Sequence, residues 1–295
     1  MIDAEKLTTA AVLGAGTMGA GIAQACAQAG LATRLHDVTE ELAAAGRGRV
    51  EAMLGKGVEK GKVSPEERDA TLGLLTTTTD VALAVRGAEI VIEAAPERLE
   101  LKRGIFARVA ELVSPACVLA TNTSSLSITS IADGLPAPGR IVGMHFFNPV
   151  PLMRLLEVVR GDMTDDSVVA LAVGLGRRLG KEPIVVRDRP GFASSRLGLA
   201  LGLEAIRMVE EGVASAADID KAMELGYRHP MGPLKLTDLV GLDVRLAIAE
   251  YLAEKLDSRR FAPPDLLRRM VAEGHVGQKS GRGFYRWVDG NPEEP

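Results

Sequence analysis

The sequence predicts an α/β protein with two domains, in which a doubly wound parallel sheet with a helical-hairpin insert precedes an all-α domain. Up to residue 188, short apolar runs typical of buried strands alternate with helical patterns. Beyond Arg189-Pro190-Gly191, a strong chain-breaking sequence, strand-like runs largely disappear. We therefore expect domains at 1–188 and 189–295, with the insert at about 40–71.

The first elements are a strand, a glycine-rich turn and a helix. Residues 8–13 (Thr-Thr-Ala-Ala-Val-Leu) are typical of a short buried strand, and the small residues of 17–29 suit a helix packed tightly on a sheet. A second strand over 32–36 ends at Asp37. This order begins the alternation of strands and helices.

A polar helical pattern follows and is interrupted by Gly61 and by Ser64-Pro65, where a serine N-cap precedes a proline at the first helical position. This predicts the helical hairpin of the insert. Further strands are expected at 90–92, 118–120, 141–143 and 184–186, with a helix at 99–113 whose apolar residues follow helical spacing.

The C-terminal domain is predicted to be helical over 192–273. Ser215-Ala216-Ala217-Asp218 resembles a capping box, with Asp in place of the more usual Glu. The aromatic residues of 281–287 are expected to pack back onto this domain.

Composition excludes several classes of partner. The net charge of -4 and the pI near 5.7 provide no broad basic field for nucleic acid or an anionic membrane surface. No uncharged apolar segment approaches the ~20 residues needed to span a bilayer, and no basic leader is present, so a cytoplasmic location is expected. Cys26 and Cys117 are expected to be reduced structural thiols, and no residue cluster has the spacing of a structural metal site.

A dinucleotide site is predicted at Gly14-Ala15-Gly16-Thr17-Met18-Gly19. Gly14 permits the tight turn, Gly16 lets backbone N–H groups approach a pyrophosphate, and Gly19 lets the helix lie close to the sheet. Asp37, at the end of the second strand, would accept hydrogen bonds from the adenosine ribose, which favours NAD over NADP. The alternative is that Asp37 only caps the helix that follows it.

A catalytic pair is predicted from His145 and Glu157, which two adjacent strands can set against each other. A histidine held by a carboxylate is suited to general base catalysis. Asn148-Pro149 after the first of these strands, and residues 121–125 after another strand, add polar groups at strand ends, where open α/β sheets bind ligands. The alternative for His145 is a satisfied core histidine.

These residues resemble the L-3-hydroxyacyl-CoA dehydrogenases, including short-chain 3-hydroxybutyryl-CoA dehydrogenases, over nearly the whole chain. Six motifs carry the resemblance: Gly14-Ala15-Gly16-Thr17-Met18-Gly19, Asn122-Thr123-Ser124-Ser125-Leu126, His145-Phe146-Phe147-Asn148-Pro149, Asp188-Arg189-Pro190-Gly191-Phe192, His229-Pro230-Met231-Gly232-Pro233 and Lys279-Ser280-Gly281-Arg282-Gly283-Phe284-Tyr285. The resemblance implies a Rossmann-like domain, NAD as cofactor, an acyl-CoA substrate and a homodimer formed through the C-terminal domain.

The resemblance also implies roles for single residues. His145 would take the proton of the substrate's 3-hydroxyl, Glu157 would orient the imidazole, and Ser124 and Asn148 would position the 3-oxygen and the nicotinamide region. Cofactor contacts are implied for Glu97, Lys102 and Asn122. For Glu97 and Lys102 the alternative is the solvated start of a helix.

Two positions bear on the substrate. Ser195 stands where the family usually has an active-site asparagine, and a hydroxyl offers a shorter reach and fewer donors than an amide. Lys60 matches a basic position that contacts coenzyme A, although Met53 replaces a serine found in some relatives, and Lys60 would also suit a solvated helix face.

Two other functions are compatible with these motifs. One is oxidation of a free hydroxy acid, as in the L-gulonate 3-dehydrogenases. The other is a non-catalytic NAD-binding protein that resembles the crystallin relatives of this family.

Overall fold

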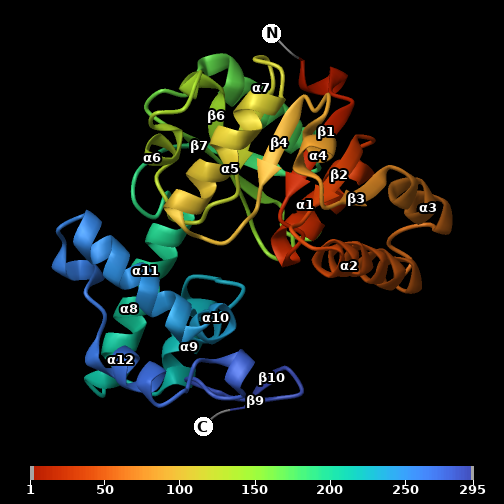
Figure 1. Ribbon diagram of the computed structural model, residues 1–295. Helices are drawn as coiled ribbons and strands as arrows, with labels where there is room; N and C mark the ends of the chain where they lie inside the picture. The colour runs from red at the N-terminus through yellow and green to blue at the C-terminus, as the bar shows by residue number, and fades with distance from the viewer. Residues whose placement is uncertain (1–2, 294–295) are drawn as a thin grey trace. The chain divides into compact units, whose positions relative to one another are not determined.

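The computed structural model describes residues 3–293 and shows two compact units, Met1–Phe192 and Ala193–Pro295, each of which is described by itself (Figure 1). The sequence places the boundary a few residues earlier, at 188/189. Residues 189–192 group with the first unit because Phe192 is buried in one of its apolar cores.

Within the described residues, the first unit contains one eight-stranded sheet with the order β3-β2-β1-β4-β5-β6-β7-β8. The strands are β1 (Thr9–Leu13), β2 (Ala32–His36), β3 (Leu75–Thr78), β4 (Ile90–Glu93), β5 (Val118–Thr121), β6 (Ile141–Phe146), β7 (Leu155–Arg160) and β8 (Glu182–Arg187).

The doubly wound sheet is confirmed, but its parallel character holds only as far as β6. Neighbours from β3 to β6 are parallel, whereas β7 runs antiparallel to β6, and β8 is parallel to β7. The short connection 147–154 explains the reversal, since a parallel neighbour requires a crossover of about a dozen residues or more. The helix α7 (Asp166–Arg178) supplies such a crossover between β7 and β8.

The helices of the first unit include those expected at 17–29, in the insert and at 99–113. They are α1 (Thr17–Gln28), α2 (Glu40–Glu59), α3 (Pro65–Gly73), α4 (Val81–Val85), α5 (Leu99–Leu112), α6 (Ile128–Ala132) and α7, with 3₁₀ turns at Ala4–Lys6 and Pro138–Arg140. Strand β3 and helices α4 and α7 were not among the elements expected from the sequence.

The insert is the pair α2 and α3, which lies beside β3 (Figure 1). A full capping box starts α3, because the Ser64 hydroxyl accepts from the Glu67 N–H at 3.1 Å and the Glu67 carboxylate accepts from the Ser64 N–H at 2.7 Å. Thr39 caps α2 by accepting from the Leu42 N–H. The alternative in which Asp37 caps that helix is therefore wrong.

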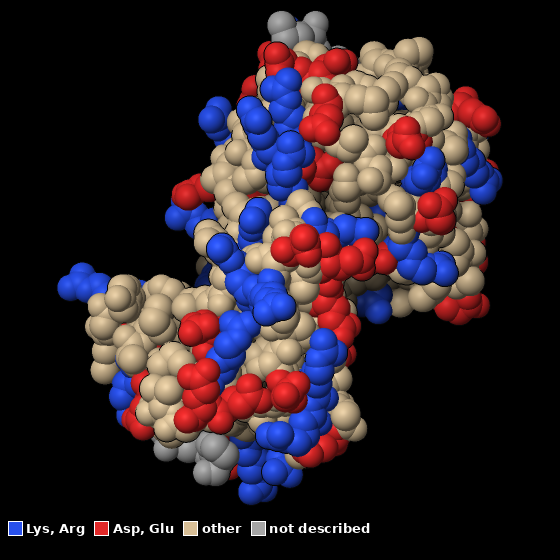
Figure 2. All heavy atoms as spheres, turned by 90° about the vertical axis from the view of Figure 1, so that its left-hand side faces the viewer, with Lys and Arg blue, Asp and Glu red and all other residues tan. Residues whose placement is uncertain are grey.

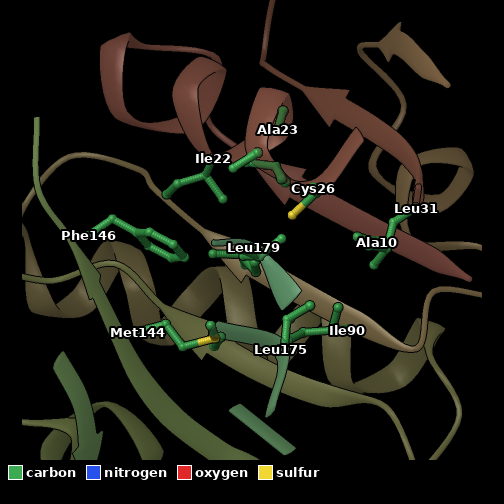
Figure 3. Close-up of a cluster of buried hydrophobic side chains, with 14 of the residues drawn as sticks. Ala10, Ile22, Ala23, Cys26, Leu31, Ile90, Met144, Phe146, Leu175 and Leu179 are labelled. Carbon is green, nitrogen blue, oxygen red and sulfur yellow. The ribbon is translucent and has the colours of Figure 1, made fainter. Parts of the chain in front are cut away.

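Two apolar cores lie on opposite faces of the sheet. Successive side chains of a strand point to opposite faces, and accordingly Ala10 and Val12 join one cluster while Ala11 and Leu13 join the other. Figure 3 shows the first cluster, in which the thiol of Cys26 lies among apolar side chains. Both cysteines are free and buried, and burial raises the pKa of each thiol to about 12, so neither is a reactive thiolate.

The second unit is helical, with a short hairpin near its end. Its elements are α8 (Ser194–Glu210), α9 (Ala216–Gly226), α10 (Pro233–Val240), α11 (Leu242–Lys255), α12 (Asp265–Ala272), 3₁₀ turns at Arg259–Phe261 and Gln278–Ser280, and strands β9 (Arg286–Val288) and β10 (Asn291–Glu293). Ser215 caps α9 by accepting from the Asp218 N–H, as expected.

Two buried aspartates attach the aromatic tail to these helices. Asp238 accepts hydrogen bonds from the Tyr285 N–H and the Trp287 ring N–H, both at 2.9 Å. Asp220 accepts from the Tyr285 hydroxyl at 2.8 Å and from the Leu234 N–H at the start of α10. The expected packing of the tail onto the helical domain is thereby confirmed.

The surface shows mixed charge. On the face in view in Figure 2, Lys and Arg side chains are interleaved with Asp and Glu. Of the helices within residues 3–293, none combines the length and apolar character that crossing a membrane requires.

Candidate active site

His145 and Glu157 form a direct pair across two strands. The residues are register partners in the antiparallel β6–β7 ladder, and His145 Nδ1 lies 2.7 Å from Glu157 Oε2. Glu157 is fully buried and His145 is 7% exposed. A carboxylate accepts, so Nδ1 carries the ring proton and Nε2 of the neutral imidazole is left to receive another.

Aromatic rings hold the imidazole on its remaining sides. The Phe147 ring lies 4.5 Å from the His145 ring and the Phe192 ring 5.9 Å from it, centroid to centroid. Among the described residues, His145 Nε2 has no hydrogen-bond partner. The arrangement fixes the tautomer and orientation of His145 and leaves one nitrogen for a ligand, which disfavours a satisfied core histidine.

The loop after β5 brings Asn122 against the same strand. Its side-chain oxygen accepts from the Phe146 N–H at 2.9 Å, and its own N–H donates to the Glu93 carbonyl. Asn148 lies just beyond the end of β6 and is exposed. Asn122 is thus held against the strand that carries His145, and Asn148 follows that strand in the chain.

Glu97 organises the loop that carries Ser124. One of its carboxylate oxygens accepts from the Thr123 hydroxyl at 2.5 Å, the Ser124 N–H at 3.0 Å and the Ser125 N–H at 3.1 Å. Burial alone would raise the pKa of Glu97, but the nearby Lys102 ammonium and these hydrogen bonds outweigh it and hold the pKa below its ordinary value. Glu97 is exposed in part but anchors the Ser124 loop, and it precedes the helix α5 instead of starting it.

Lys102 is completely buried and serves the same network. Its ammonium donates to Glu93 at 2.7 Å and to the Ala95 carbonyl at 3.2 Å, and lies 3.5 Å from Glu97. These acceptors satisfy the three N–H groups of a lysine. The Lys102 ammonium therefore links Glu93 to Glu97.

Glu93 belongs to this network and was not expected from the sequence. It is fully buried at the end of β4 and also accepts from the Thr121 hydroxyl at 2.6 Å, which joins the ends of β4 and β5. The sequence feature that could have indicated Glu93 is a carboxylate as the last residue of an apolar strand.

The glycine-rich turn has the geometry that a pyrophosphate requires. Gly14 has φ +102°, and a side chain at Gly19 would place its Cβ 1.7 Å from the Gly14 carbonyl oxygen. In contrast, no atom lies within 4 Å of a Cβ built at Gly16, so the turn is open there. Gly16 is the N-cap of α1 and has no side chain to cap the N–H groups of Thr17 and Met18, which leaves them for an anion.

Asp37 closes the turn from the next strand. One of its oxygens accepts from the Ala15 N–H at 2.7 Å and the other from the Val38 N–H at 2.7 Å. The Ala15 amide is thus used to hold Asp37 in place. A carboxylate fixed at the end of β2 is suited to the ribose hydroxyls and repels a 2′-phosphate.

A cavity of about 740 Å³ lies beside this turn. Gly14, Gly16, Thr17, Met18 and Asp37 contribute to its wall, together with residues that the sequence analysis did not single out: Leu13, His36, Val38, Leu42, Val81, Ala94, Ala95, Pro96, Arg98, Leu101, Ile105 and Arg108. Its size and largely apolar wall suit the adenosine half of a dinucleotide. The residues present therefore fit NAD.

Lys60 and Ser195 are the two residues that the sequence analysis relates to the substrate. Lys60 follows the last residue of α2 and is exposed, and the side-chain ammonium groups of Lys60 and Lys56 have no carboxylate or carbonyl partner among residues 3–293. Arg47 and Arg49 are engaged, the first with Glu51 and the second with the Ala15 carbonyl. Ser195 is half-buried in the first turn of α8, in the second unit.

No group of three or more His, Cys, Asp and Glu side chains that could hold a metal ion occurs in the part of the chain that the structure describes. The glycine turn, the carboxylate after β2 and the histidine–glutamate pair together define an NAD-dependent dehydrogenase of the Rossmann class.

Comparison with known proteins agrees and is more specific. Residues 9–189 match the 3-hydroxyacyl-CoA dehydrogenase, NAD binding domain, and residues 191–287 match the 3-hydroxyacyl-CoA dehydrogenase, C-terminal domain. The chain therefore belongs to the 3-hydroxyacyl-CoA dehydrogenase family, as the sequence motifs indicate.

Individual relatives support this assignment along the full chain. A probable 3-hydroxybutyryl-CoA dehydrogenase of Deinococcus radiodurans is 44% identical over 276 residues, which cover 94% of this chain and 99% of the relative. The crystal structure of M. tuberculosis FadB2 has a TM-score of 0.92 at 44% identity and covers 96% of this chain and 99% of its own. That of (S)-3-hydroxybutyryl-CoA dehydrogenase PaaH1 from Ralstonia eutropha has a TM-score of 0.93 at 39% identity, with 96% and 100% covered.

Proposed function

We propose that this NAD-dependent dehydrogenase uses His145 as general base and Glu157 as the group that orients it. The observation that carries the proposal is the 2.7 Å contact between Nδ1 and a fully buried carboxylate. Such a carboxylate fixes the imidazole tautomer and stabilises the imidazolium that forms when Nε2 takes a proton.

The reaction converts an (S)-3-hydroxyacyl-CoA and NAD⁺ into the 3-oxoacyl-CoA, NADH and a proton, or the reverse. NAD⁺ held at the glycine turn would supply the acceptor for the hydride that leaves C3 of the substrate. His145 Nε2 takes the 3-hydroxyl proton as the C3–O bond becomes a carbonyl, and later releases it to solvent. In the reverse direction the same imidazolium donates the proton to the 3-oxygen.

Other residues of the site act by position. Ser124 and Asn148 hold the 3-oxygen and the nicotinamide region, and Ser195 adds one hydrogen bond to the substrate. The Gly14–Gly19 turn and Asp37 hold the pyrophosphate and the ribose, with Asn122 beside the nicotinamide. Glu97 and Lys102 hold the Ser124 loop, which agrees with the network of short hydrogen bonds around Glu97.

A four-carbon substrate, 3-hydroxybutyryl-CoA, is the first to test, because relatives at 39–44% identity carry that name. The ammonium groups of Lys56 and Lys60 on the insert, which pair with no carboxylate of the described chain, are suited to the coenzyme A phosphates. The cytoplasm, where acyl-CoA and NAD are both available, is the proposed location.

We also propose that residues 189–295 form the substrate and dimerisation domain. Several large apolar side chains of this unit are exposed, which is unusual for a surface that stays in water. They are Leu197, Leu225, Tyr227, Leu236, Leu239, Val240 and Val244. Sedimentation equilibrium should show a dimer, and a monomer would contradict a role of these exposed side chains in dimerisation.

The test of the catalytic proposal is reduction of acetoacetyl-CoA by NADH, followed by NADH absorbance. His145→Gln should abolish turnover while NADH binding, measured by fluorescence, stays within about threefold of the wild type. His275→Gln, at a half-buried surface histidine beside Glu273, is the matched control and should be fully active.

Two results would overturn the proposal. A His145→Gln enzyme with near-normal kcat would exclude His145 as the base. A wild-type protein that binds NADH but turns over no 3-oxoacyl-CoA would favour a non-catalytic NAD-binding role. A wild-type protein that instead oxidises free hydroxy acids such as L-gulonate would favour a free hydroxy acid dehydrogenase.

A further inference from the structure

Lys181, which directly precedes β8 in the first unit, is a buried cation held by carbonyl groups instead of a carboxylate. The residue is 7% exposed, and its ammonium donates to the Val150 carbonyl and, at 3.0 Å, to the Met153 carbonyl. Burial lowers the pKa of Lys181, with no opposing contribution from a carboxylate within residues 3–293. Lysines are seldom buried without a partner. The two carbonyls are therefore the groups that compensate for burial of this charge.

Both carbonyls belong to the turn 147–154, which joins β6 to β7. Inside the turn, the Leu152 and Met153 N–H groups both donate to the Pro149 carbonyl at 3.0 Å. These bonds shape the turn but do not attach it to the rest of the unit. The ladder with β8 begins only at the end of the turn, where the Arg154 carbonyl accepts from the N–H of residue 182. Lys181, 31 residues from Val150 along the chain, attaches the middle of the turn.

A second attachment of the turn is to the cofactor helix α1. The Val150 side chain is 2% exposed, and a Cβ built at Gly21 of α1 would lie 2.9 Å from the Val150 Cβ. Gly21 therefore lets Val150 pack closely on the helix. The Arg154–Glu182 ion pair is exposed and adds little, because surface ion pairs are weak. One buried side chain and one buried ammonium group thus fix the turn.

Asn148 depends on this turn for its position. It is exposed, it directly precedes Pro149, and its side chain makes no hydrogen bond to another residue within 3–293. No contact of its own amide therefore fixes the residue, and its place relative to His145 is set by the backbone on either side. On one side this backbone is β6, and on the other it is the turn that Lys181 holds.

We propose that Lys181 is a positioning residue for the dehydrogenase reaction, which holds the turn 147–154 and thereby fixes Asn148 relative to His145. The proposal rests on the function proposed above, which places Asn148 at the 3-oxygen and the nicotinamide region. Lys181 acts on turnover only through the turn. Its effect should still be large, because a displacement of about 1 Å in a positioning group can lower a rate about 100-fold.

The experiment is a double-mutant cycle on the reduction of acetoacetyl-CoA by NADH. Lys181→Met keeps an unbranched side chain but removes the charge and the N–H donors. It should lower kcat by about 10- to 100-fold, with the dissociation constant of NADH within about threefold of the wild type. Asn148→Ala should lower kcat by a similar factor. The double variant should be at most about threefold slower than the slower single variant, because without Asn148 there is no amide left to position.

Arg178→Met is the matched control for a loss of stability. The Arg178 guanidinium also donates to backbone carbonyls, including those of Leu7 and Ala29, but to none in the turn. Its loss should lower the melting temperature and leave kcat within about threefold of the wild type. Val150→Ala loosens the second attachment without removing a charge, and it should lower kcat about three- to tenfold.

Three results would overturn the proposal. One is a folded Lys181→Met enzyme with kcat within about threefold of the wild type, another is a fully active Asn148→Ala enzyme, and the third is a double variant in which the two losses multiply as independent effects do. If Lys181→Met does not fold, Val150→Ala decides, and an unchanged kcat in that variant overturns the proposal as well. A wild type without turnover contradicts the proposed function, whereas an active wild type with any of these results contradicts the role of Lys181 alone.

Discussion

Replacing Glu157 with Gln removes the negative charge next to His145 while nearly preserving the volume of the side chain. The two groups are 2.7 Å apart and Glu157 is fully buried, so water screens their attraction weakly. The charge appears on His145 only when Nε2 takes the substrate proton. The carboxylate therefore stabilises the transition state more than the ground state, and its loss should appear in kcat.

The magnitude follows from the geometry. With the two charge centres about 4 Å apart and an effective dielectric constant of about 20, Coulomb's law gives about 4 kcal/mol. A charged hydrogen bond measured by mutation contributes less, about 1.5–3 kcal/mol. At 1.36 kcal/mol per factor of ten, these two estimates bracket a fall in kcat of about 10-fold to about 10³-fold.

The assay is steady-state reduction of acetoacetyl-CoA by NADH, with NADH binding and the melting temperature measured on the same samples. NADH affinity should be unchanged, because the cofactor turn lies on other strands. Glu182→Gln is the matched control: Glu182 begins β8, and its carboxylate forms an exposed pair with Arg154, so its loss should have little effect. A folded Glu157→Gln enzyme with kcat within about threefold of the wild type would refute the orienting role of the carboxylate.

Four further outcomes follow from the site. Gly16→Ala should fold normally, since no atom lies within 4 Å of the added Cβ. The methyl group should nevertheless block the open side of the turn and weaken NADH binding about tenfold or more in a fluorescence titration. Gly48→Ala on α2, where the added Cβ is equally unobstructed, is the control and should bind NADH normally. Lys102→Met should lower the free energy of unfolding by about 3–5 kcal/mol in urea, because it leaves the buried carboxylate at the end of β4 unpaired. Ser195→Asn should raise kcat/KM for acetoacetyl-CoA by a factor of about two to ten through one added hydrogen bond, and an unchanged value would show that the serine already makes that contact. The pKa of Glu97 in the folded protein is below the ordinary value of a glutamate. The ionised carboxylate therefore contributes its full stabilisation at pH values above the ordinary pKa, and this contribution is lost as the pH falls through the lowered pKa. In acid unfolding, Glu97→Gln should lack this loss of stability.

Local sequence signals predicted the first part of the fold well. The strand, glycine turn, helix and strand over 9–36 were expected within one residue or so, because the pattern of apolar and small residues there is governed by burial alone. Ser64-Pro65 predicted the start of α3 because a cap is a contact between neighbours in the chain. In contrast, β3 is a run of threonines after one leucine and has little apolar character, although threonine's preference for strands could have indicated it.

The residues of the site likewise include some that local sequence patterns indicate and others that only the folded structure reveals. His145 and Asp37 could be singled out from the sequence because each lies near the end of an apolar strand. The burial of Lys102 and its pairing with Glu93 could not, because a lysine in an amphipathic helix is ordinarily solvated and its partner lies on a strand packed against the helix only after folding.

The reversal of β7 explains why the catalytic pair can exist at all. Up to β6 the sheet is parallel and places its polar residues at the strand ends, where a ligand binds, but none of those ends supplies a buried carboxylate to His145. The turn at 147–154 returns the chain along β6 and sets Glu157 directly opposite His145. A shift of one residue in this register would move Glu157 to the other face of the sheet. The geometry of the pair therefore depends on the length of that turn, and inserting one glycine between Leu152 and Met153 should lower kcat more than NADH binding if the register slips, but should leave both unchanged if the extra residue is absorbed in the loop.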